Sequence, residues 1–469
     1  MDWYYYIALA AIASQLLFLL QTYNNYRYSL KKYRKERSWY RPRTALIVPC
    51  KGLDSAFHEN ISSFFDLDYE DYLLWFVVAD ESDPAYNELH ELKTQLQSRS
   101  KARDVQIFVA GQGRSCSQKI HNLLYCYHRV GEGIDVLAFA DSDICVRSNW
   151  LSHLVYPLRK EKNGAASGYR WFIPKKNNLA SLALSALNAK VAQLLGNTHF
   201  NQAWGGSMAI RVEVFRRLGL DKLWQTTLSD DLSLSCAVKK AGMKVVFVPA
   251  CLVASYEATR WRELFEFGRR QFLITRVSAP KTWWFGLFSS LYGVLGVWGA
   301  AGLAVWLANS KLEIRNSKFP AVLAAVAVVF FLSQLLRAIL RQKMARKILD
   351  LRSWRGRPGL ASRRHLADGN EQGQDALATE QIGNHKSEIT NRMRAACAAD
   401  VLGFWLWSIL MLLLIVSSAF GRTVCWRGIR YRLLSATETI VVGEKESVPP
   451  GMAGATEPTR TPQSQAEKI

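Results

Sequence analysis

The chain has 469 residues, with 60 lysines and arginines against 39 aspartates and glutamates, which gives a formal net charge of +21. This length can hold one substantial domain with membrane segments or two modest domains, and the charge, unusual for a plain soluble enzyme, indicates anionic partners. The basic residues cluster beside apolar segments without any zinc-finger or RNA-binding motif, which argues against a nucleic acid polymer, and the eight cysteines form no C-x-x-C pair, which argues against structural zinc or a disulfide framework.

The N-terminal stretch predicts a membrane anchor. Residues 1–25 are nearly all apolar from Tyr4 to Tyr23, roughly long enough for a helix to span the hydrocarbon core. No positively charged segment precedes this stretch and no small-residue cleavage site follows it, so an anchor fits better than a removable signal peptide. A basic juxtamembrane segment, 26–43, follows at once, and by the positive-inside rule we expect the next domain to be cytoplasmic.

Residues 44–256 form short apolar runs separated by polar helical stretches, the pattern of an α/β domain with a mostly parallel sheet. Four of these runs are predicted to be strands: Thr44–Pro49, Leu73–Val78, Val105–Val109 and Val136–Phe139. Polar and acidic residues gather where the runs end, and in an open α/β sheet ligands bind beyond the carboxyl ends of the strands. This arrangement is typical of nucleotide-binding domains in general.

Asp141 and Asp143 directly follow the fourth run. A single Asp-x-Asp pair is more often a solvated loop end than a metal site. Here a second acidic pair, Asp230–Asp231, and a basic pair, Arg269–Arg270, follow at domain-scale distances and strengthen the functional interpretation. The Asp230–Asp231 pair opens a predicted helix over 232–241, where the helix dipole accounts for one carboxylate but not readily for two.

Two further stretches of the domain have alternative interpretations. Asn178–Leu195 is strongly apolar and predicts a helix, either in the core or lying on the bilayer. Gln202–Met208 is a glycine-rich turn before a strand-like run. Such glycines permit a ligand to approach the backbone closely, although tight turns are the commoner reason for them.

The C-terminal half predicts more membrane segments. Residues 257–282 mix aromatic side chains with arginines, as expected of a helix in the membrane interface. Residues 283–340 contain two further spanning helices, and 341–396 predicts a basic, partly disordered loop. Residues 397–434 hold a membrane or re-entrant helix and a Trp-Arg-Gly-x-x-Tyr-Arg segment, and 435–469 predicts a disordered tail.

The last apolar segment, 398–420, poses a question of topology. A full crossing would place the basic stretch Trp426–Arg432 outside, against the positive-inside rule. We therefore expect this segment to be re-entrant or to lie along the interface, with a true crossing as the alternative. The protein is thus expected to be an integral, multi-pass membrane protein with a cytoplasmic catalytic domain.

Together, the charged clusters have the chemistry needed for transfer from a diphosphate leaving group. Asp141 and Asp143 would hold a hard divalent cation, Mg²⁺ or Mn²⁺, which binds phosphate oxygens. The Arg269–Arg270 pair and Lys119 would supply further positive charge to the leaving group. Asp231 is the best candidate for the base that takes a proton from an attacking hydroxyl. Attack opposite to departure would invert the sugar carbon.

Several ordered motifs extend over about Thr44 to Arg276 and into the C-terminal segment. They are Pro49-Cys-Lys51-Gly52-Leu-Asp54, Phe64-Phe-Asp-Leu-Asp-Tyr69, Asp83-Pro84-Ala85, Lys119-Ile-His-Asn122, Asp141-Ser-Asp143, Gly206-Ser207-Met208, Asp230-Asp231 and Trp426-Arg427-Gly428-Ile-Arg-Tyr431-Arg432. In this order, and with membrane segments on both sides, they resemble the motifs of family-2-type glycosyltransferases, most closely the ceramide glucosyltransferase group. Several ordered motifs are far more specific than any one of them.

The resemblance implies an α/β fold of the GT-A type, a mixed nucleotide-sugar-binding sheet with helices on both faces, and transmembrane helices at both ends of the chain. It implies a UDP-sugar donor, with UDP-glucose as the leading candidate, and a lipid hydroxyl acceptor at the bilayer. It implies that Asp141 and Asp143 bind the metal and that Asp231 is the catalytic base. It also implies catalytic roles for Asp230 and Arg270. Substrate contacts are implied for Lys51, Asp80, Asp83, Lys119, Asn122, Trp204, Gly205, Gly206, Arg269, Trp426 and Arg427.

The chain departs from the family pattern at two positions. Phe267-Gly-Arg-Arg270-Gln271 retains the second arginine of an Arg/Gln-x-x-Arg-Trp motif but lacks the tryptophan, and Asp230 replaces a usual glutamate. The missing tryptophan and the small number of spans favour transfer of a single sugar to a lipid over a processive polysaccharide synthase of the same family. A non-catalytic membrane protein that binds nucleotide or lipid is the third hypothesis, and the intact acidic and arginine clusters argue against it.

Overall fold

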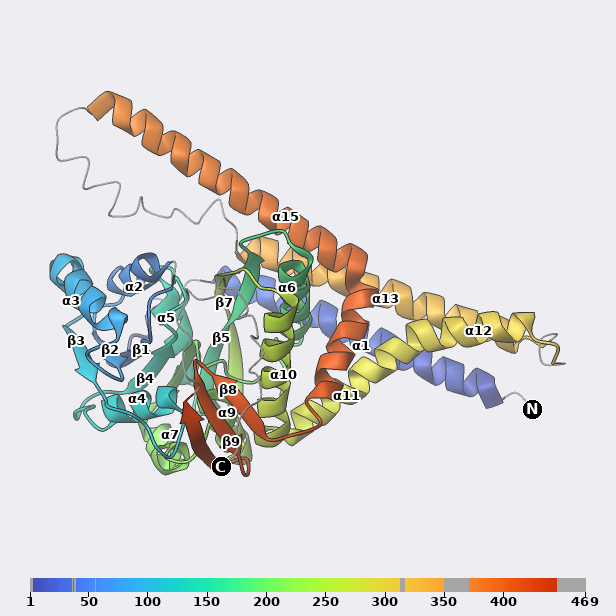
Figure 1. Cartoon of the computed structure of the whole chain (residues 1–469), viewed down its shortest axis with the longest axis horizontal. Coiled ribbons are helices and arrows are strands. Elements are labelled where there is room, and N and C mark those ends of the chain that lie inside the picture. Colours follow the sequence, from blue (N-terminus) through green and yellow to red (C-terminus); the bar gives the residue numbers. More distant parts are fainter. Residues whose placement is uncertain are drawn as a thin grey trace, which may run out of the picture.

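The computed structural model describes residues 3–35, 37, 39–54, 56–312, 317–349 and 371–444, and of these 371–390 and 444 by their backbone alone. An α/β domain holds the large sheet, and a group of long helices extends from it to one side (Figure 1). The N-terminal helix belongs to that group, so the start of the chain lies far from the sheet (Figure 1).

In the described part of the chain, the α/β domain contains a seven-stranded sheet of order β3-β2-β1-β4-β6-β5-β7. The strands are β1 (Thr44–Pro49), β2 (Tyr72–Val78), β3 (Asp104–Val109), β4 (Val136–Ala140), β5 (Asn163–Pro174), β6 (Ser207–Arg211) and β7 (Lys244–Glu257). Strands β1 to β4 run parallel, β6 is antiparallel to β4 and to β5, and β7 is parallel to β5. The predicted mixed sheet is confirmed, and its first four strands lie where the apolar runs placed them.

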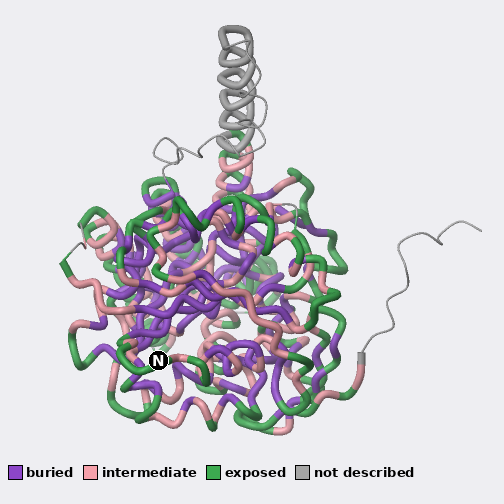
Figure 2. Tube along the Cα trace, turned by 90° about the vertical axis from the view of Figure 1, so that its left-hand side faces the viewer, coloured by how far each residue is buried: buried purple, intermediate pink, exposed green. Residues whose placement is uncertain are grey.

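Both faces of the sheet are buried, because alternate residues of the central strands enter two separate cores. In β1, Leu46 and Val48 enter one core, whereas Ile47 enters the other. The first core is closed by α2 (Phe57–Phe65), α3 (Pro84–Leu96) and α5 (Trp150–Val155), and the second by α4 (Gln118–Tyr127), α7 (Val212–Arg217), α8 (Leu220–Trp224) and α9 (Asp230–Lys240). Figure 2 shows the buried segments in the middle of the domain with exposed loops around them. A sheet covered on both faces binds ligands at its strand ends.

Four helices among the described residues are long and apolar enough to cross a bilayer. They are α1 (Trp3–Tyr33), Pro280–Asn309, α13 (Phe319–Ile348) and Asn391–Ser417, the apolar part of α15 (Glu371–Ser417). Pro280–Asn309 consists of α11 (Pro280–Val294), a π-helical turn (Leu295–Gly299) and α12 (Ala300–Asn309). Only 6% of the apolar window of α1 is buried within the protein, against 44% for α15. The chain is therefore a membrane protein. Helix α1 leaves more of its apolar surface exposed than α15 does.

Helices α1 and α13 run side by side in the same direction. Gln15 donates a hydrogen bond to Ser333, and Arg337 donates one to Thr22, both over 3.1 Å. The C-terminal ends of the two helices therefore lie together, and both carry basic residues in the last turn. This end adjoins the α/β domain, where Tyr28 of α1 donates a hydrogen bond to a carbonyl of β7 over 2.9 Å.

The interval 341–396 differs from the expected basic, partly disordered loop. Helix α13 continues to Ile348, and α15 begins at Glu371, while 350–370 lie outside the described residues. The sequence after Glu371 has few apolar residues, which suggested disorder, but it is rich in alanine, glutamate and glutamine. These residues have high helix propensity, so a helix that continues from an anchored membrane segment can extend through them.

A three-stranded antiparallel sheet follows α15 in the described residues. Its strands are β8 (Thr423–Trp426), β9 (Ile429–Leu433) and β10 (Thr439–Glu444), with β9 in the middle. Ile429, Tyr431 and Leu433 are buried against α10 (Trp261–Ser278). The expected disordered tail is therefore wrong for 435–444, because β-branched residues in this short stretch pair with β9 and one face of the sheet is buried. Residues 445–469 lie outside the described residues.

A buried ion pair joins α13 to α15. The Arg341 guanidinium donates hydrogen bonds of 2.5 and 2.8 Å to the two oxygens of Asp400, and the two residues are 4% and 0% exposed. We expect Asp400→Ala to lower the free energy of unfolding by about 3–5 kcal/mol, because it leaves Arg341 buried without a counter-charge. Thermal unfolding of the purified protein measures the loss.

The control for this variant removes an exposed ion pair. Lys101 Nζ and Asp68 Oδ1 are 2.7 Å apart, and both side chains are 53% exposed. Asp68→Ala should cost at most about 1 kcal/mol, because water screens the lost attraction. Similar losses in the Asp400 and Asp68 variants would contradict a structural role for the buried pair.

Candidate active site

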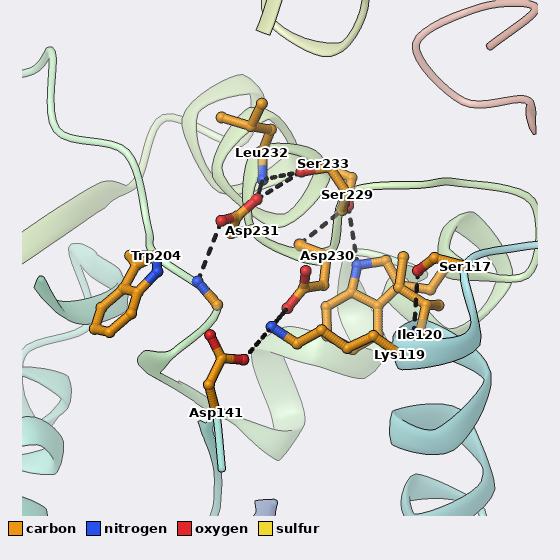
Figure 3. Close-up of polar contacts among 12 residues, drawn as sticks. Ser117, Lys119, Ile120, Asp141, Trp204, Ser229, Asp230, Asp231, Leu232 and Ser233 are labelled. Carbon is orange, nitrogen blue, oxygen red and sulfur yellow. Dashed lines mark hydrogen bonds and ion pairs between the residues drawn. The ribbon is translucent and has the colours of Figure 1, made fainter. Parts of the chain in front are cut away.

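Lys119 lies between two of the predicted acidic residues. Its Nζ atom is 2.7 Å from Asp141 Oδ1 and 3.1 Å from Asp230 Oδ2 (Figure 3). Lys119 is in the first turn of α4, Asp141 follows β4, and Asp230 opens α9. The end of a strand and the starts of two helices thus bring together charges that are far apart in the sequence.

Asp231 is oriented by hydrogen bonds at the start of α9. Ser229 is the N-cap of this helix, and its hydroxyl donates to Asp231 Oδ1 over 2.5 Å. The amide of Leu232 donates to the same oxygen over 2.7 Å, and the amide of Gly205 donates to Oδ2 over 3.2 Å (Figure 3). The carboxylate is therefore fixed in one orientation, and it is only half-buried, so a substrate can reach it.

Gly205 and Gly206 permit the close approach of these groups. A Cβ atom on Gly205 would lie 2.4 Å from Asp230 Oδ2. A Cβ atom on Gly206 would lie 2.2 Å from the Trp204 ring and 2.6 Å from Asp141 Oδ2. These distances are well inside van der Waals contact, so a side chain at either position would displace the carboxylates. The glycine-rich turn therefore serves the acidic cluster itself.

Burial and mutual repulsion shift the pKa values of the cluster. Burial raises the pKa of Asp230 to about 6; Lys119 opposes this shift, whereas Asp231 and Asp141 add to it. Burial would lower the pKa of Lys119, but its attraction to Asp141 and Asp230 outweighs burial and raises that pKa. Burial would raise the pKa of Asp141, but Lys119 and Arg170 hold it below its usual value. Lys119 is thus a charged bridge between the two carboxylates at neutral pH.

One oxygen of Asp143 has no partner. Its Oδ1 atom is buried without a hydrogen bond among the described residues, while Oδ2 lies 3.9 Å from Arg170 Nη1. Burial raises the pKa of Asp143, and the nearby charge of Asp141 raises it further. A hard divalent cation would satisfy this oxygen, so the residues present fit the predicted metal. The described residues contain no cluster of three or more His, Cys, Asp or Glu side chains suited to a metal, so the protein would supply two carboxylates and the substrate and water the remaining ligands.

A cavity of about 510 Å³, the polar cavity, opens beyond the carboxyl ends of β1 and β4. Eight of the predicted site residues line it: Lys51, Lys119, Asn122, Asp141, Asp143, Arg270, Trp426 and Arg427. Its volume is in the range of small-molecule sites. Lysine and arginine side chains beside the two carboxylates suit a cation and a diphosphate bound together.

The C-terminal sheet closes one side of the polar cavity. Lys51 Nζ donates to the carbonyl of Arg427 over 3.1 Å, and Arg427 Nη1 donates to the carbonyl of Lys51 over 2.7 Å. Arg270 donates to the carbonyl of Cys425 over 3.2 Å. Arg427 and Gly428 have φ angles of 48° and 86°, the left-handed conformation that a tight two-residue hairpin requires. This turn therefore aims Trp426 and Arg427 at the cavity.

Asp80 and Asp83 lie outside the polar cavity. Asp83 is the N-cap of α3, where its Oδ1 accepts hydrogen bonds from the amides of Ala85 and Gly52 over 2.9 and 2.8 Å. It therefore fixes the loop after β1, which carries Lys51. Asp80 is exposed and accepts a hydrogen bond from the amide of Ser82 over 2.8 Å. Neither residue contacts the Asp141 cluster in this structure.

Arg269 and Arg270 point in different directions. Arg270 lines the polar cavity, whereas Arg269 donates hydrogen bonds to the carbonyls of Ser417 and Phe420 over 3.2 and 2.8 Å. These carbonyls belong to the end of α15 and the residues after it, where a cation satisfies orphan acceptors and the helix dipole. Arg269 thus joins α10 to α15 and is not brought into the site.

Arg170 is a site residue that the sequence analysis missed. It lies on β5, its guanidinium is 5.0 Å from the centre of the Trp204 ring, and its Nη1 atom is 3.9 Å from Asp143 Oδ2. Its signal in the sequence is a single charge within the aromatic run Tyr169–Phe172. Strand β5 was not predicted, so nothing placed this charge beside β4.

A second cavity of about 450 Å³, the apolar cavity, meets the first at Lys119, Asp141 and Arg270. Asp230 and Asp231 line only the apolar cavity, and Asp143 lines only the polar one. The apolar cavity extends among α1, α6 (Leu179–Ala192), α10, α11, α13 and α15. Its walls include Phe18, Leu184, Leu187, Phe267, Phe272, Trp283, Phe404 and Met411. Helix α6, which could have been a core or a bilayer helix, is a core helix buried against β5 and α15.

Two solved structures resemble the chain in part. The mannosyltransferase PcManGT from Pyrobaculum calidifontis, in complex with GDP-Man and Mn²⁺, is 15% identical with a TM-score of 0.35, and the match covers 84% of this chain and 98% of that one. GalNAc-T7 with UDP, GalNAc and Mn²⁺ is 13% identical with a TM-score of 0.32, and the match covers 51% of each chain. At these scores the ligands of the two proteins are not carried over to this chain.

A family model gives the stronger comparison. The model described as glycosyl transferase family 21 matches residues 4–354 of the 469. The match begins in α1, includes all of the seven-stranded sheet with the Asp141 and Asp231 clusters, and ends just beyond α13. The GT-A-type fold and the class of enzyme expected from the motifs are therefore confirmed. The chain is a glycosyltransferase and belongs to glycosyl transferase family 21.

Proposed function

We propose that this glycosyltransferase moves one sugar from a UDP-sugar to a hydroxyl group of a ceramide-like membrane lipid, with inversion of the sugar carbon. UDP-glucose is the leading candidate for the donor. The observation that carries the proposal is the division of the acidic residues between two cavities. Asp143 lines only the polar cavity, Asp231 lines only the apolar cavity, and Asp141 lies where they meet. A nucleotide-sugar and a lipid would thus approach Asp141 from different sides. The resemblance to the ceramide glucosyltransferase group supports the choice of sugar and lipid.

On the donor side, the chain would bind and neutralise a diphosphate. Asp141 and Asp143 would hold the divalent cation, which when bound supplies positive charge to the phosphate oxygens. Lys119 and Arg270 line the same cavity and add positive charge without moving. Burial lowers the pKa of Arg270, with Arg170 as a further cause, but an arginine stays charged at neutral pH. These groups stabilise the charge that builds up as the bond to the sugar breaks.

On the acceptor side, Asp231 is the proposed base. Its carboxylate would accept the proton of the lipid hydroxyl, and hydrogen bonds from Gly205 and Ser229 keep the carboxylate oriented. Because Asp231 faces the apolar cavity and Asp143 the polar one, the proton would be taken on the side opposite to the departing diphosphate. A single inverting displacement needs this arrangement.

We further propose that α1, Pro280–Asn309 and α13 cross the bilayer, and that the apolar part of α15 lies along its cytoplasmic face. Asp400 is bonded to Arg341 near the domain end of α13. Just past the other end of α15, Ser418 accepts a hydrogen bond of 2.9 Å from Trp283, near the domain end of α11. Both ends of the apolar part of α15 are thus held at the level of the catalytic domain. This supports the interfacial alternative over a crossing and keeps the basic C-terminal sheet inside.

The test is a transfer assay with the purified protein in vesicles that contain ceramide. Labelled UDP-glucose, UDP-galactose, UDP-N-acetylglucosamine and GDP-mannose are compared, each with Mg²⁺, Mn²⁺ or a chelator. We expect one labelled lipid that forms from UDP-glucose and requires a divalent cation. Label in a water-soluble polymer would instead indicate a polysaccharide synthase. Binding of UDP without any labelled product would indicate a non-catalytic protein.

A further inference from the structure

One wall of the apolar cavity is polar and positively charged. Lys190 of α6 and Arg337 of α13 both line the cavity. Lys190 Nζ donates a hydrogen bond to the Ser408 hydroxyl of α15 over 2.5 Å, and Arg337 Nε donates one to the Thr22 hydroxyl of α1 over 3.1 Å. Both partners are neutral, so these contacts hold the two side chains in place without neutralising their charges.

The nearby carboxylate, Asp400, already accepts three hydrogen bonds from other residues. Asp400 accepts two hydrogen bonds from Arg341 and one of 2.7 Å from Gln342. In the part of the chain that the structure describes, no carboxylate oxygen lies within 4.0 Å of the charged nitrogens of Lys190 or Arg337. Arg341 therefore takes the one nearby carboxylate, and Lys190 and Arg337 have no counter-charge of their own.

An excess of charge inside a protein is unfavourable unless something balances it. Burial lowers the pKa of Lys190 well below its usual value, and Arg341 lowers it further while Asp400 opposes the shift. Arg337 does not give up its proton, because a guanidinium stays charged in proteins. Buried charges are normally paired, and a bound anion would also raise the pKa of Lys190 and restore its charge, so a lysine and an arginine cation that line one cavity indicate a ligand of opposite charge.

The level of this cluster in the membrane region indicates a lipid headgroup. Arg337 is bonded to Thr22, which lies at the end of the apolar part of α1 and shortly before the basic residues that begin at Arg27. On α13 the same boundary lies at Arg337, because the residues before it are almost all apolar and Arg341 and Lys343 follow. Lipid phosphates lie at this boundary between hydrocarbon and basic flanks, and basic pockets between membrane helices bind anionic headgroups.

We propose that Lys190 and Arg337 form a binding site for a phosphate group within the apolar cavity. An anionic phospholipid of the bilayer is one source of that group, and free phosphate is the other. Lysine and arginine donate charge-assisted hydrogen bonds to phosphate oxygens, and the apolar walls of the cavity suit the acyl chains of a lipid. The site is distinct from Asp141 and Asp231, and it does not depend on the proposed transfer reaction.

The test measures ligand-induced stabilisation of the full-length protein in a neutral detergent. Dioleoyl phosphatidic acid, dioleoyl phosphatidylcholine and inorganic phosphate are added separately, and the unfolding temperature is followed by tryptophan fluorescence. We expect phosphatidic acid to raise it in a saturable way. In the double variant Lys190→Met, Arg337→Met its apparent affinity should fall by at least about tenfold, since hydrogen bonds to charged groups are lost.

Two further variants control for folding and for surface charge. Lys190→Gln keeps a donor for Ser408 but removes one charge, and it should give an intermediate loss of affinity. Lys343→Met with Lys347→Met removes two exposed charges from the same helix and should leave the stabilisation intact. Stabilisation by inorganic phosphate that the double variant abolishes would support the site with a soluble source. Equal stabilisation by phosphatidylcholine, or an undiminished effect in the double variant, would overturn the proposal.

Discussion

Asp231→Asn is expected to slow sugar transfer by about 10²–10⁴-fold while the affinity for UDP stays nearly unchanged. An amide has the size of the carboxylate but cannot take the proton of an attacking hydroxyl. Its oxygen can still accept the hydrogen bonds that Ser229 and the Leu232 amide donate to Oδ1, and only the bond from the Gly205 amide to Oδ2 is lost, so the start of the helix should survive. UDP affinity is expected to survive because Asp231 lines only the apolar cavity. Initial rates with a labelled UDP-sugar and calorimetric titration with UDP measure the two quantities.

The matched control is Asp221→Asn. Asp221 also lies in the first turn of a helix, α8, but it lines neither cavity. Its replacement removes the same charge from a comparable position and should leave both transfer and UDP binding unchanged. Loss of UDP binding in parallel with transfer in the Asp231 variant would show that this residue has a role on the donor side and is not the base.

Asp143→Asn and Asp141→Asn are expected to abolish transfer alike but to change the stability of the metal-free protein in opposite directions. One oxygen of Asp143 is buried without a partner next to Asp141, so loss of its charge removes an unfavourable burial and should stabilise the metal-free protein by about 1 kcal/mol. Asp141 is 2.7 Å from Lys119, so its loss should destabilise the protein by about 1–3 kcal/mol. Chemical unfolding in the presence of a chelator measures both changes.

The same unfolding measurements are then repeated with a divalent cation in place of the chelator. Mn²⁺ should stabilise the unmodified protein, and the stabilisation should be lost in both variants, because each loses one of the two carboxylates that the protein supplies. If Mn²⁺ stabilises the Asp143 variant as strongly as the unmodified protein, Asp143 does not hold the metal. If the Asp143 variant is less stable than the unmodified protein in chelator, the unpaired oxygen has an unrecognised structural role.

The first four strands could be predicted because their residues carry a strong local signal. Strands β1, β2 and β4 are short apolar runs buried on both faces, β3 is a half-buried apolar run at the edge of the sheet, and Asp141 and Asp143 stop the fourth run abruptly. Strand β5 has no such signal. It is long, it mixes small and polar residues, and its pairing with β7 contains register shifts between Asn163 and Ala165 and between Ser167 and Tyr169. A strand of this kind is stabilised by its neighbours, which the local sequence does not reveal.

In the site, the motifs predict which residues take part, but only the packing of the elements decides where each side chain points. The Asp230–Asp231 pair was predicted as a unit, but the structure uses Asp230 to hold Lys119 and leaves Asp231 open to the apolar cavity. Arg269 and Arg270 are adjacent in the sequence, yet successive residues of a helix point about 100° apart. Only one of them can face the site, and the position of α15 decides which. Asp83, of the Asp83-Pro84-Ala85 motif, acts indirectly: it accepts a hydrogen bond from the Gly52 amide and so fixes the loop that carries Lys51.

The hairpin of β8 and β9 follows the seven-stranded sheet and all of the long apolar helices in the chain, yet it forms a wall of the polar cavity through Trp426 and Arg427. Synthesis proceeds from the N-terminus, and domains generally fold as they emerge. The seven-stranded sheet, α11, α12 and α13 are therefore complete before this wall of the polar cavity exists. A chain that terminates before β8 would contain the apolar helices and the acidic cluster but lack this wall of the polar cavity, and we expect it to be inactive.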